Sequence, residues 1–292
     1  MANSGRKLGR ITDRPNWEAE LILAFVLKKP QAWILAHPKE KVPNSKFQIL
    51  NSLVNRRSKG EPLAYVLGEQ EFYGLPFKVN KHVLIPRPET EQIAQHVTRN
   101  AQQGDNLMII DVGTGSGAII ISLAKNIENK NVKYFATDIS SKALAVAKQN
   151  AKLNGVDKNI TFLKGNLLEP IIKNSEIRNL FKIQNSKFKI LILANLPYLK
   201  TSLPGLTKAQ KRDLSFEPKT ALLAGPDGLK YYRQLAKQIL TLKKTYPQLS
   251  IELLAEIDPD QVKPMKQLFS FAKNFGVKKD FRGLNRLCII SI

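Results

Sequence analysis

The feature that most constrains the fold is an alternation of short apolar runs with helical patterns, which extends from about residue 107 to the end of the chain. Seven runs have the length and composition of β-strands, namely residues 107–111, 132–137, 160–163, 190–194, 251–255, 277–281 and 286–292. Helical patterns separate most of them, over residues 118–125, 142–153, 229–243 and 260–274. Nearly continuous apolar strands joined by helices are typical of a parallel sheet that is buried on both faces.

The last two runs are joined by only about four residues, which is too short a connection for two parallel strands. The sequence therefore predicts an α/β fold with a seven-stranded, mostly parallel, Rossmann-like sheet and an antiparallel last strand. Residues 171–187 are polar and basic, and we expect them to form a surface excursion between two strands.

The N-terminal part of the chain has a different texture. Helical patterns cover residues 17–23, 31–37 and 45–57, and Trp17 and Trp33 are expected in the core that these helices form. Short β-prone pieces follow at residues 64–68, 71–74 and 77–79, broken by Gly and Pro, as in a hairpin. We therefore predict three parts: a helical N-terminal domain (1–62), a β-hairpin connector (63–83) and the α/β domain (84–292).

Composition says more about partners than about the fold. The chain of 292 residues carries 46 Lys and Arg against 24 Asp and Glu, which gives a formal net charge of +22. So large an excess favours an acidic partner, such as nucleic acid or an acidic protein. The alternative is a lysine-rich compositional drift of the source organism.

Several classes of protein are excluded by what the composition lacks. One cysteine, Cys288, rules out an internal disulfide and is expected to be a buried core thiol. The three histidines, His37, His82 and His96, lie too far apart in sequence to form a ligand motif, so we expect no metal. Since no apolar run reaches the ~18–20 residues of a membrane span and no signal-peptide core is visible, we expect a cytoplasmic protein with no membrane partner.

A glycine-rich turn follows the strand at residues 107–111 and opens the next helix. Its residues are Asp111, Val112, Gly113, Thr114, Gly115, Ser116 and Gly117. Glycines let the backbone approach a ligand closely, and the helix N-terminus presents free N–H groups. Asp138 ends the next strand, where a carboxylate accepts hydrogen bonds from a ribose diol. This pattern indicates a cofactor that contains a nucleoside, without saying which one; no Gly-Lys-Ser/Thr follows as in a Walker-type phosphate loop.

The fourth strand ends in a second polar motif, Asn195-Leu196-Pro197-Tyr198. Carboxyl ends of parallel strands are where open α/β sheets bind ligands. The Asn195 amide oxygen and the Leu196 carbonyl, aimed by Pro197, together can accept both hydrogens of a planar NH₂ group, while Tyr198 offers a flat face to it. An amide or aryl amine nitrogen is a poor nucleophile. The site must therefore orient it and stabilise, through these acceptors, the positive charge that develops on it during transfer.

Together these motifs resemble a class I S-adenosylmethionine-dependent N-methyltransferase. A more specific likeness lies upstream, in Glu61-Pro62-Leu63-Ala64-Tyr65-Val66-Leu67-Gly68, Phe72-Tyr73-Gly74 and Val83-Leu84-Ile85-Pro86-Arg87-Pro88-Glu89-Thr90-Glu91. This run, which follows a small helical domain, resembles the release-factor glutamine methyltransferases of the HemK/PrmC type over essentially the whole chain. The resemblance implies a methyltransferase sheet, and methyl transfer from S-adenosyl-L-methionine, giving S-adenosyl-L-homocysteine. The implied acceptor is the glutamine amide in the Gly-Gly-Gln motif of peptide chain release factors, a protein methylation that acts on translation termination.

The resemblance also implies roles for residues. Gly113 to Gly117 would wrap the methionine part of the cofactor, Asp138 would bind the ribose, and Asn166 and Leu167 would border the adenine. Asn195 and the Leu196 carbonyl would hold the glutamine amide with Pro197 and Tyr198 beside it, and Pro86 to Glu91 would lie next to the cofactor. We expect Asp111, Thr114, Ser116 and Asn195 at the cofactor as well, the helical domain to recognise the substrate, and the enzyme to be a monomer.

The chain departs from the family pattern at one informative position. The family usually has Asn-Pro-Pro-Tyr, whereas Leu196 stands here in place of the first proline. Asn-Leu-Pro-Tyr is also the spelling seen in ribosomal-RNA adenine dimethyltransferases, so an adenine-N6 methyltransferase acting on rRNA or DNA is the alternative. A third hypothesis is a cofactor-binding regulator without transfer activity.

Overall fold

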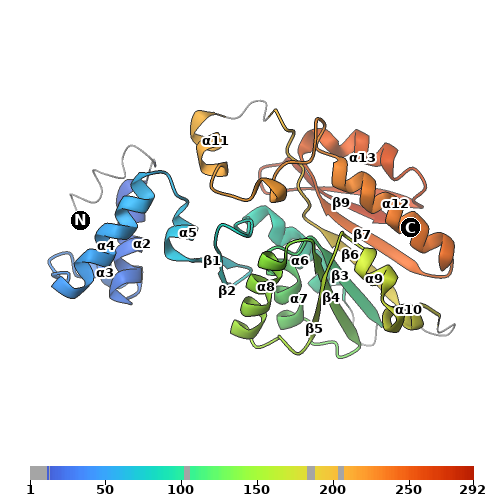
Figure 1. Ribbon diagram of the computed structural model, residues 1–292, viewed down its shortest axis with the longest axis horizontal. Coiled ribbons are helices and arrows are strands. Elements are labelled where there is room, and N and C mark those ends of the chain that lie inside the picture. The colour runs from blue at the N-terminus through green and yellow to red at the C-terminus, as the bar shows by residue number, and fades with distance from the viewer. Residues whose placement is uncertain (1–11, 13, 102–105, 183–187, 203–206) are drawn as a thin grey trace. The chain divides into compact units, whose positions relative to one another are not determined.

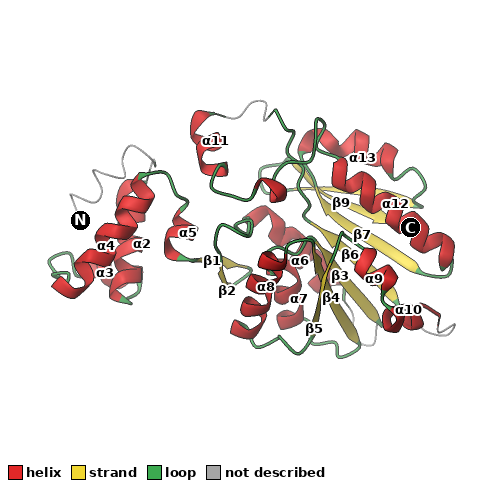
Figure 2. Cartoon of the chain, viewed as in Figure 1, coloured by secondary structure: helices red, strands yellow, loops and turns green. Residues whose placement is uncertain are grey.

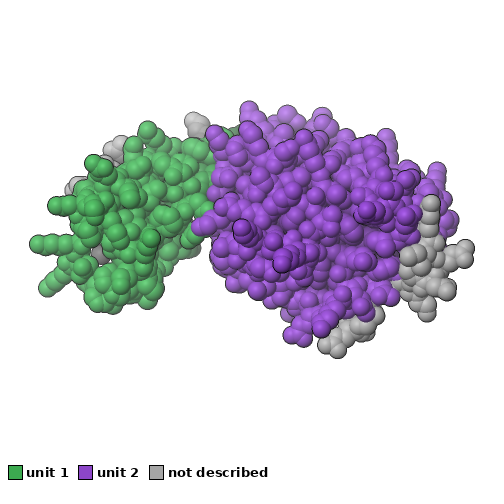
Figure 3. Space-filling view, turned by 60° about the horizontal axis from the view of Figure 1, so that its bottom comes forward, with its two compact units in different colours: residues 1–69, 205–217 green, residues 70–204, 218–292 purple. Residues whose placement is uncertain are grey.

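The computed structural model describes residues 12, 14–101, 106–182, 188–202 and 207–292. The chain divides into two compact units, one of residues 1–69 and 205–217 and the other of residues 70–204 and 218–292 (Figure 3). The second unit contains the sheet and is continuous in space although residues 205–217 interrupt it in sequence. The boundaries of the three predicted parts, after residues 62 and 83, stay a prediction.

Unit 1 is helical, as predicted for this part of the chain (Figure 1). Its described helices are α2 (Pro15–Leu27), α3 (Gln31–Ala36), α4 (Asn44–Ser58), α5 (Leu63–Leu67) and α11 (Lys208–Leu214). They bury a small apolar core that includes Ile22, Leu53 and Val66. Trp33 packs against this core, but the prediction for Trp17 is wrong, because this side chain is 45% exposed on α2.

The prediction of a β-prone piece at residues 64–68 is wrong as well, because these residues form most of α5. Pro62 precedes the helix with extended backbone, and Gly68 ends it in the left-handed conformation (φ 75°). Leu63, Val66 and Leu67 pack on the core of unit 1. Burial of this face overrides the strand preference of Tyr and Val, since β propensity depends on the tertiary surroundings.

A segment distant in sequence completes unit 1. Gly60 has φ 96°, and a Cβ atom at this position would lie 2.8 Å from Cδ of Arg212, which belongs to α11. Glycine therefore permits both the turn after α4 and the close approach of the Arg212 side chain. The contact between Gly60 and Arg212 was not predicted, because no local sequence pattern indicates it.

The sheet of unit 2 has seven strands in the order β5-β4-β3-β6-β7-β9-β8. The strands are β3 (Leu107–Val112), β4 (Val132–Asp138), β5 (Ile160–Lys164), β6 (Lys189–Ala194), β7 (Ser250–Glu256), β8 (Asn274–Lys279) and β9 (Asn285–Ser291). Five neighbouring strands, β5, β4, β3, β6 and β7, are parallel, and β9 is antiparallel to both β7 and β8. The predicted seven-stranded, mostly parallel sheet with an antiparallel last strand is confirmed.

Helices cover both faces of this sheet (Figure 2). Successive residues of β3 alternate between them: Leu107 and Ile109 pack with one group of helices, and Met108 and Ile110 with the other. The first group is α6 (Glu91–Asn100), α7 (Ala118–Asn126) and α8 (Ser141–Leu153). The second group is α9 (Glu169–Lys173), α10 (Ser175–Lys182), α12 (Lys230–Thr245) and α13 (Val262–Leu268).

Two connections differ from their sequence predictions. The described part of residues 171–187 is not a plain surface excursion, because α9 and α10 bury Ile171, Ile177 and Phe181 in the core. The polar residues between these three apolar ones face outward, which hid the amphipathic pattern in a basic segment. The helix predicted over residues 260–274 ends at Leu268, and residue 274 already begins β8.

The predicted β-hairpin is present as β1 (Glu69–Phe72) and β2 (Leu75–Lys78). Phe72 and Phe77 pack in the core of the sheet domain, and a buried amide adds polar contacts. Asn150 of α8 accepts a hydrogen bond from the Lys78 N–H (2.7 Å) and donates to the Lys78 carbonyl (3.0 Å). It also donates to the Ser116 carbonyl (2.9 Å) in the glycine turn. The hairpin and the glycine turn are therefore held by the same side chain.

Two further observations bear on the predictions from composition. Cys288 is fully buried in β9, as expected of a core thiol, and burial raises the pKa of its thiol to about 12. Within the described ranges, no helix combines the length and apolarity that crossing a membrane requires.

A buried ion pair in unit 1 generates the first testable prediction. Arg57 donates to both carboxylate oxygens of Glu18, at 2.7 and 3.0 Å, and each residue is 7% exposed. Removing one partner leaves the other charge buried, so we expect Glu18→Ala to lower the free energy of unfolding by about 3–5 kcal/mol. Chemical denaturation of the full chain measures this, with Glu40→Ala on the exposed surface as the control. Equal stability of the two variants would contradict the prediction.

Candidate functional site

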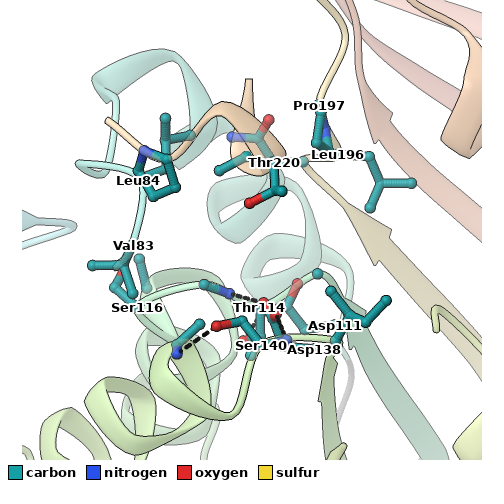
Figure 4. A pocket seen from close by; sticks show the side chains of 18 of the residues that line it. Val83, Leu84, Asp111, Thr114, Ser116, Asp138, Ser140, Leu196, Pro197 and Thr220 are labelled. Carbon is teal, nitrogen blue, oxygen red and sulfur yellow. Dashed lines mark hydrogen bonds between the residues drawn. The ribbon is translucent and has the colours of Figure 1, made fainter. Parts of the chain in front are cut away.

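A cavity of about 380 Å³ opens at the carboxyl ends of β3, β4 and β6, within unit 2. The lining combines the glycine turn, Asp138, the turn after β5 and the motif after β6. Figure 4 shows Leu84, Pro197 and Thr220 on one side of this cavity, and Thr114, Ser116 and Ser140 on the other. Of the predicted site residues, the lining includes Asp111, Gly113, Thr114, Gly115, Ser116, Asp138, Asn166, Leu167, Asn195, Leu196 and Pro197.

The glycine turn adopts backbone conformations that favour glycine. Gly113, Gly115 and Gly117 have φ of 72°, 56° and 82°. The Thr137 carbonyl of β4 accepts hydrogen bonds from the N–H groups of Gly113 (2.8 Å) and Thr114 (3.0 Å), which fixes the turn against the neighbouring strand. Gly117 does not line the cavity; a Cβ there would lie 2.6 Å from Cδ1 of Ile121, so its role is close packing.

Asp138 is oriented by backbone donors at the end of β4. Its carboxylate accepts from the Gly115 N–H (3.0 Å) and from the Ser140 N–H (2.8 Å), one on each oxygen. Each carboxylate oxygen has a further acceptor site, so the group is able to receive the two hydroxyls of a ribose. Burial raises the pKa of Asp138 above its ordinary value.

Asp111 lies deeper, at the base of the same cavity. It is 1% exposed, and its Oδ2 accepts a hydrogen bond from the Thr114 hydroxyl at 2.6 Å. Burial raises the pKa of Asp111 to about 7, against the lowering effect of that hydrogen bond, and the Asp138 carboxylate raises it further. A carboxyl poised near neutral pH is a feature of functional sites.

The turn after β5 is held in an unusual conformation. Leu167 is a non-glycine residue with φ 53°, and its carbonyl accepts from the buried Thr137 hydroxyl at 2.8 Å. Gln238 of α12 clamps the turn from outside, because it accepts from the Leu168 N–H (2.7 Å) and donates to the Asn166 carbonyl (3.3 Å). Backbone strain of this kind is maintained only where the surrounding contacts enforce it. This wall of the cavity is therefore held in one conformation by its hydrogen bonds.

The motif after β6 enters the cavity with three of its four residues. Asn195, Leu196 and Pro197 line it, and the Asn195 Nδ2 donates to the Thr90 Oγ1 at 2.8 Å. Tyr198 is not among the lining residues; its hydroxyl donates to Glu256 Oε1 at 3.3 Å. Its packing against a substrate amide stays a prediction.

Thr90, which lines the cavity, and Glu256, which lies next to it, had no specific role in the sequence predictions. The Thr90 hydroxyl lies 2.6 Å from Glu256 Oε2, and both side chains are buried. A signal existed for Glu256: it ends β7, and the register of β6 and β7 pairs Ala194 with Ala255, so Asn195 and Glu256 leave the same sheet edge side by side. For Thr90 the resemblance had indicated only a place near the cofactor.

The cavity fits a nucleoside-containing cofactor. Its volume falls within the range of about 300–1,000 Å³ that is usual for small-molecule sites. Asp138 supplies acceptors for a diol, and Leu167 and Ile139 supply apolar walls; Ile139 is 67% exposed in this structure. Gly113, Gly115 and Asn195 line the same cavity.

Comparison with known families agrees with this geometry. Residues 103–277 match the family described as "Methyltransferase domain", and residues 5–68 match the "PrmC N-terminal domain". In structure, the chain is similar to the hMettl16 catalytic domain solved in complex with MAT2A 3'UTR hairpin 6 (TM-score 0.53, covering 85% of this chain and 81% of that one). At 14% identity this likeness shows the fold alone. The protein is a class I methyltransferase, which takes its methyl group from S-adenosylmethionine.

Curated relatives narrow the class to one family. The chain is 33% identical over 289 residues to the release factor glutamine methyltransferase of Coxiella burnetii, covering 98% of this chain and 95% of the relative. It is 34% identical over 275 residues to that of Moorella thermoacetica, covering 94% and 90%. The chain therefore belongs to the release factor glutamine methyltransferase family. The resemblance inferred from the Pro86–Glu91 run and the two motifs is confirmed.

The pKa of Asp111 generates a prediction about stability. In the unfolded chain this carboxyl titrates near 3.8, and in the folded protein near 7. Its neutral form thus contributes stability that is complete below about pH 4 and is lost as pH rises through about 7. We expect the wild type to lose up to about 4 kcal/mol between pH 4 and pH 8 relative to Asp111→Asn, which stays neutral.

Chemical denaturation of both proteins across this pH range measures the difference. Asp157→Asn, at an exposed position, is the control for the loss of a carboxylate. A difference between the wild type and Asp111→Asn that is constant with pH would contradict the prediction.

Proposed function

We propose that this enzyme methylates the side-chain amide nitrogen of the glutamine in the Gly-Gly-Gln motif of peptide chain release factors. The observation that carries the proposal is the convergence, in one cavity, of the glycine turn with Asp138 and of Asn195 with Leu196. The first pair is suited to a nucleoside cofactor, and the second presents acceptors for an NH₂ group. Membership of the family favours this reaction over adenine-N6 methylation of rRNA or DNA.

The residues of the chain have to orient a weak nucleophile. When bound, the cofactor supplies an electrophilic methyl group on a sulfonium. The Asn195 Oδ1 and the Leu196 carbonyl accept the two amide hydrogens of the glutamine, which turns the nitrogen toward that methyl and increases its electron density. The amide proton leaves to solvent after transfer. Leu196 takes the place of a proline here, and its side chain is held by burial (3% exposed).

Because the substrate of this family is a protein, we assign the charge of the chain to steering rather than to nucleic-acid binding. A net charge of +22 accelerates encounter with an acidic protein partner through its long-range field. Because release factors work in translation, we place the enzyme in the cytoplasm. We further propose that it acts as a monomer and that its helical N-terminal part recognises the substrate.

The reaction itself is the first prediction of this proposal. Labelled S-adenosylmethionine is incubated with the enzyme and either a release factor or its Gly-Gly-Gln→Gly-Gly-Ala variant, and label is counted in the protein. We expect transfer to the first and none to the second, since alanine has no side-chain amide. Parallel reactions with purified rRNA and DNA test the alternative, and label in either of them, without label in the release factor, would overturn the proposal.

The second prediction concerns Asn195. Replacing it by alanine removes one preorganised hydrogen-bond acceptor, so kcat for the release factor should fall by about 10²-fold or more. Cofactor affinity, measured by calorimetry, should change far less. The matched control is Asn159→Ala, at an exposed position before β5, and near-normal kcat in Asn195→Ala would refute the assigned role.

A further inference from the structure

We propose that Thr90 and Glu256 are positioning residues, which hold the Asn195 amide with its oxygen toward the substrate and its nitrogen away from it. The inference rests on the proposed function for its catalytic consequence. It rests on geometry alone for the orientation itself, because the three side chains form one hydrogen-bonded chain, Asn195–Thr90–Glu256.

The first step concerns the hydrogen bonds that Glu256 accepts. This side chain is 3% exposed, and its two oxygens meet the Thr90 hydroxyl at 2.6 Å and the Tyr198 hydroxyl at 3.3 Å. An ionised carboxylate only accepts hydrogen bonds. When Glu256 is ionised, both hydroxyls therefore point their protons at it.

The second step follows at Thr90. A hydroxyl has one proton, and Thr90 uses this proton to donate a hydrogen bond to Glu256. Toward other groups the Thr90 oxygen therefore acts only as an acceptor. The Asn195 side chain lies 2.8 Å away, and only its NH₂ end satisfies an acceptor. The amide oxygen is consequently turned away from Thr90 and is left for the cavity that Asn195 lines.

The third step is the catalytic consequence. The two orientations of an asparagine amide have nearly the same shape, so packing alone does not choose between them, whereas hydrogen-bond partners do. With the oxygen in the cavity, Asn195 accepts from the glutamine NH₂. In the flipped orientation two NH₂ groups face each other, which repels the substrate from the reactive position.

The charge state of Glu256 decides which orientation is favoured. Burial, the largest effect, raises the pKa of this carboxyl above its ordinary value, and Glu89 before α6 raises it further. The hydrogen bonds from Thr90 and Tyr198 and the charge of Arg286 in β9 lower it. Tyr198 and, from α12, Tyr232 also interact with it, and Arg87 and Cys288 lie next to these two tyrosines. Protonated Glu256 is able to donate to Thr90, which frees the Thr90 proton for the Asn195 oxygen. Activity should therefore be present above the pKa of Glu256 and decline as pH falls through it.

The first test compares variants that keep or break this chain of hydrogen bonds. Thr90→Val removes the hydroxyl at nearly constant volume, Glu256→Gln supplies an NH₂ that donates to Thr90, and Thr90→Ser restores the hydroxyl. We expect kcat for the release factor to fall at least tenfold in the first two and to recover largely in Thr90→Ser, with cofactor Kd within about twofold throughout. Glu256→Gln should also lose the acidic limb of the kcat–pH profile. Thr161→Val, exposed on β5, is the matched control.

A double-variant comparison separates positioning from other roles of Thr90. If Thr90 acts through Asn195, adding Thr90→Val to Asn195→Ala should cause no further loss of kcat. An equal tenfold loss in both backgrounds, or wild-type kcat in Thr90→Val, would overturn the proposal.

The second test needs no substrate, so it distinguishes failure of this inference from failure of the proposed function. In the ¹⁵N-labelled full chain, the side-chain NH₂ signal of Asn195 is assigned by its disappearance in Asn195→Ala. Its protons should be protected from exchange in the wild type and in Thr90→Ser, and should lose that protection in Thr90→Val and Glu256→Gln. Fast exchange in the wild type would refute the orientation, even if the release factor is methylated. Should Thr90→Val fail to fold, the wild type and Glu256→Gln decide the outcome.

Discussion

The site depends on how closely the glycine turn approaches the motif after β6. A Cβ on Gly113 would lie 2.9 Å from Cδ2 of Leu196, so the absence of a side chain at residue 113 is what lets the two segments touch. Their strands are neighbours, with Val112 paired to Ala194 in parallel register. Parallel pairing therefore brings the glycine turn and the motif after β6 to the same edge of the sheet, and Gly113 lets the two segments come into contact.

Buried polar side chains then hold the surrounding segments to that edge. Asn150 ties the hairpin to the glycine turn, Gln238 clamps the turn that ends at Leu168, and Thr90 ties Asn195 to Glu256. Buried amides and hydroxyls are costly unless their hydrogen bonds are made, so each of these contacts allows essentially one arrangement. The cavity is in this sense defined as much by polar side chains from three elements outside the sheet, Asn150, Gln238 and Thr90, as by the strands.

The sequence predicted more of the fold than of the site. Continuous apolar runs located the inner strands of the sheet, because burial on both faces leaves a pattern that needs no tertiary information. The edge strand β8 has no residue that is fully buried, and it begins three residues before the predicted run at 277–281. The glycine turn, Asp138 and Asn195 were found because each lies at the carboxyl end of a predicted strand. The predictions failed where burial opposed local preference, as in α5, or where it was hidden in a basic segment, as in α9 and α10.

What the sequence determined by itself was the sheet, its antiparallel last strand and the residues that end its strands, together with the family that those motifs identify. The tertiary structure alone decided that Thr90 meets Glu256, which lies 166 residues away, and that residues 205–217 join the helical unit. Neither contact has a local signature, because a hydroxyl and a carboxylate are ordinary residues until the fold buries them together. Folding brings Thr90, Glu256 and Asn195 together, and the hydrogen bonds between them then determine how the Asn195 amide is oriented.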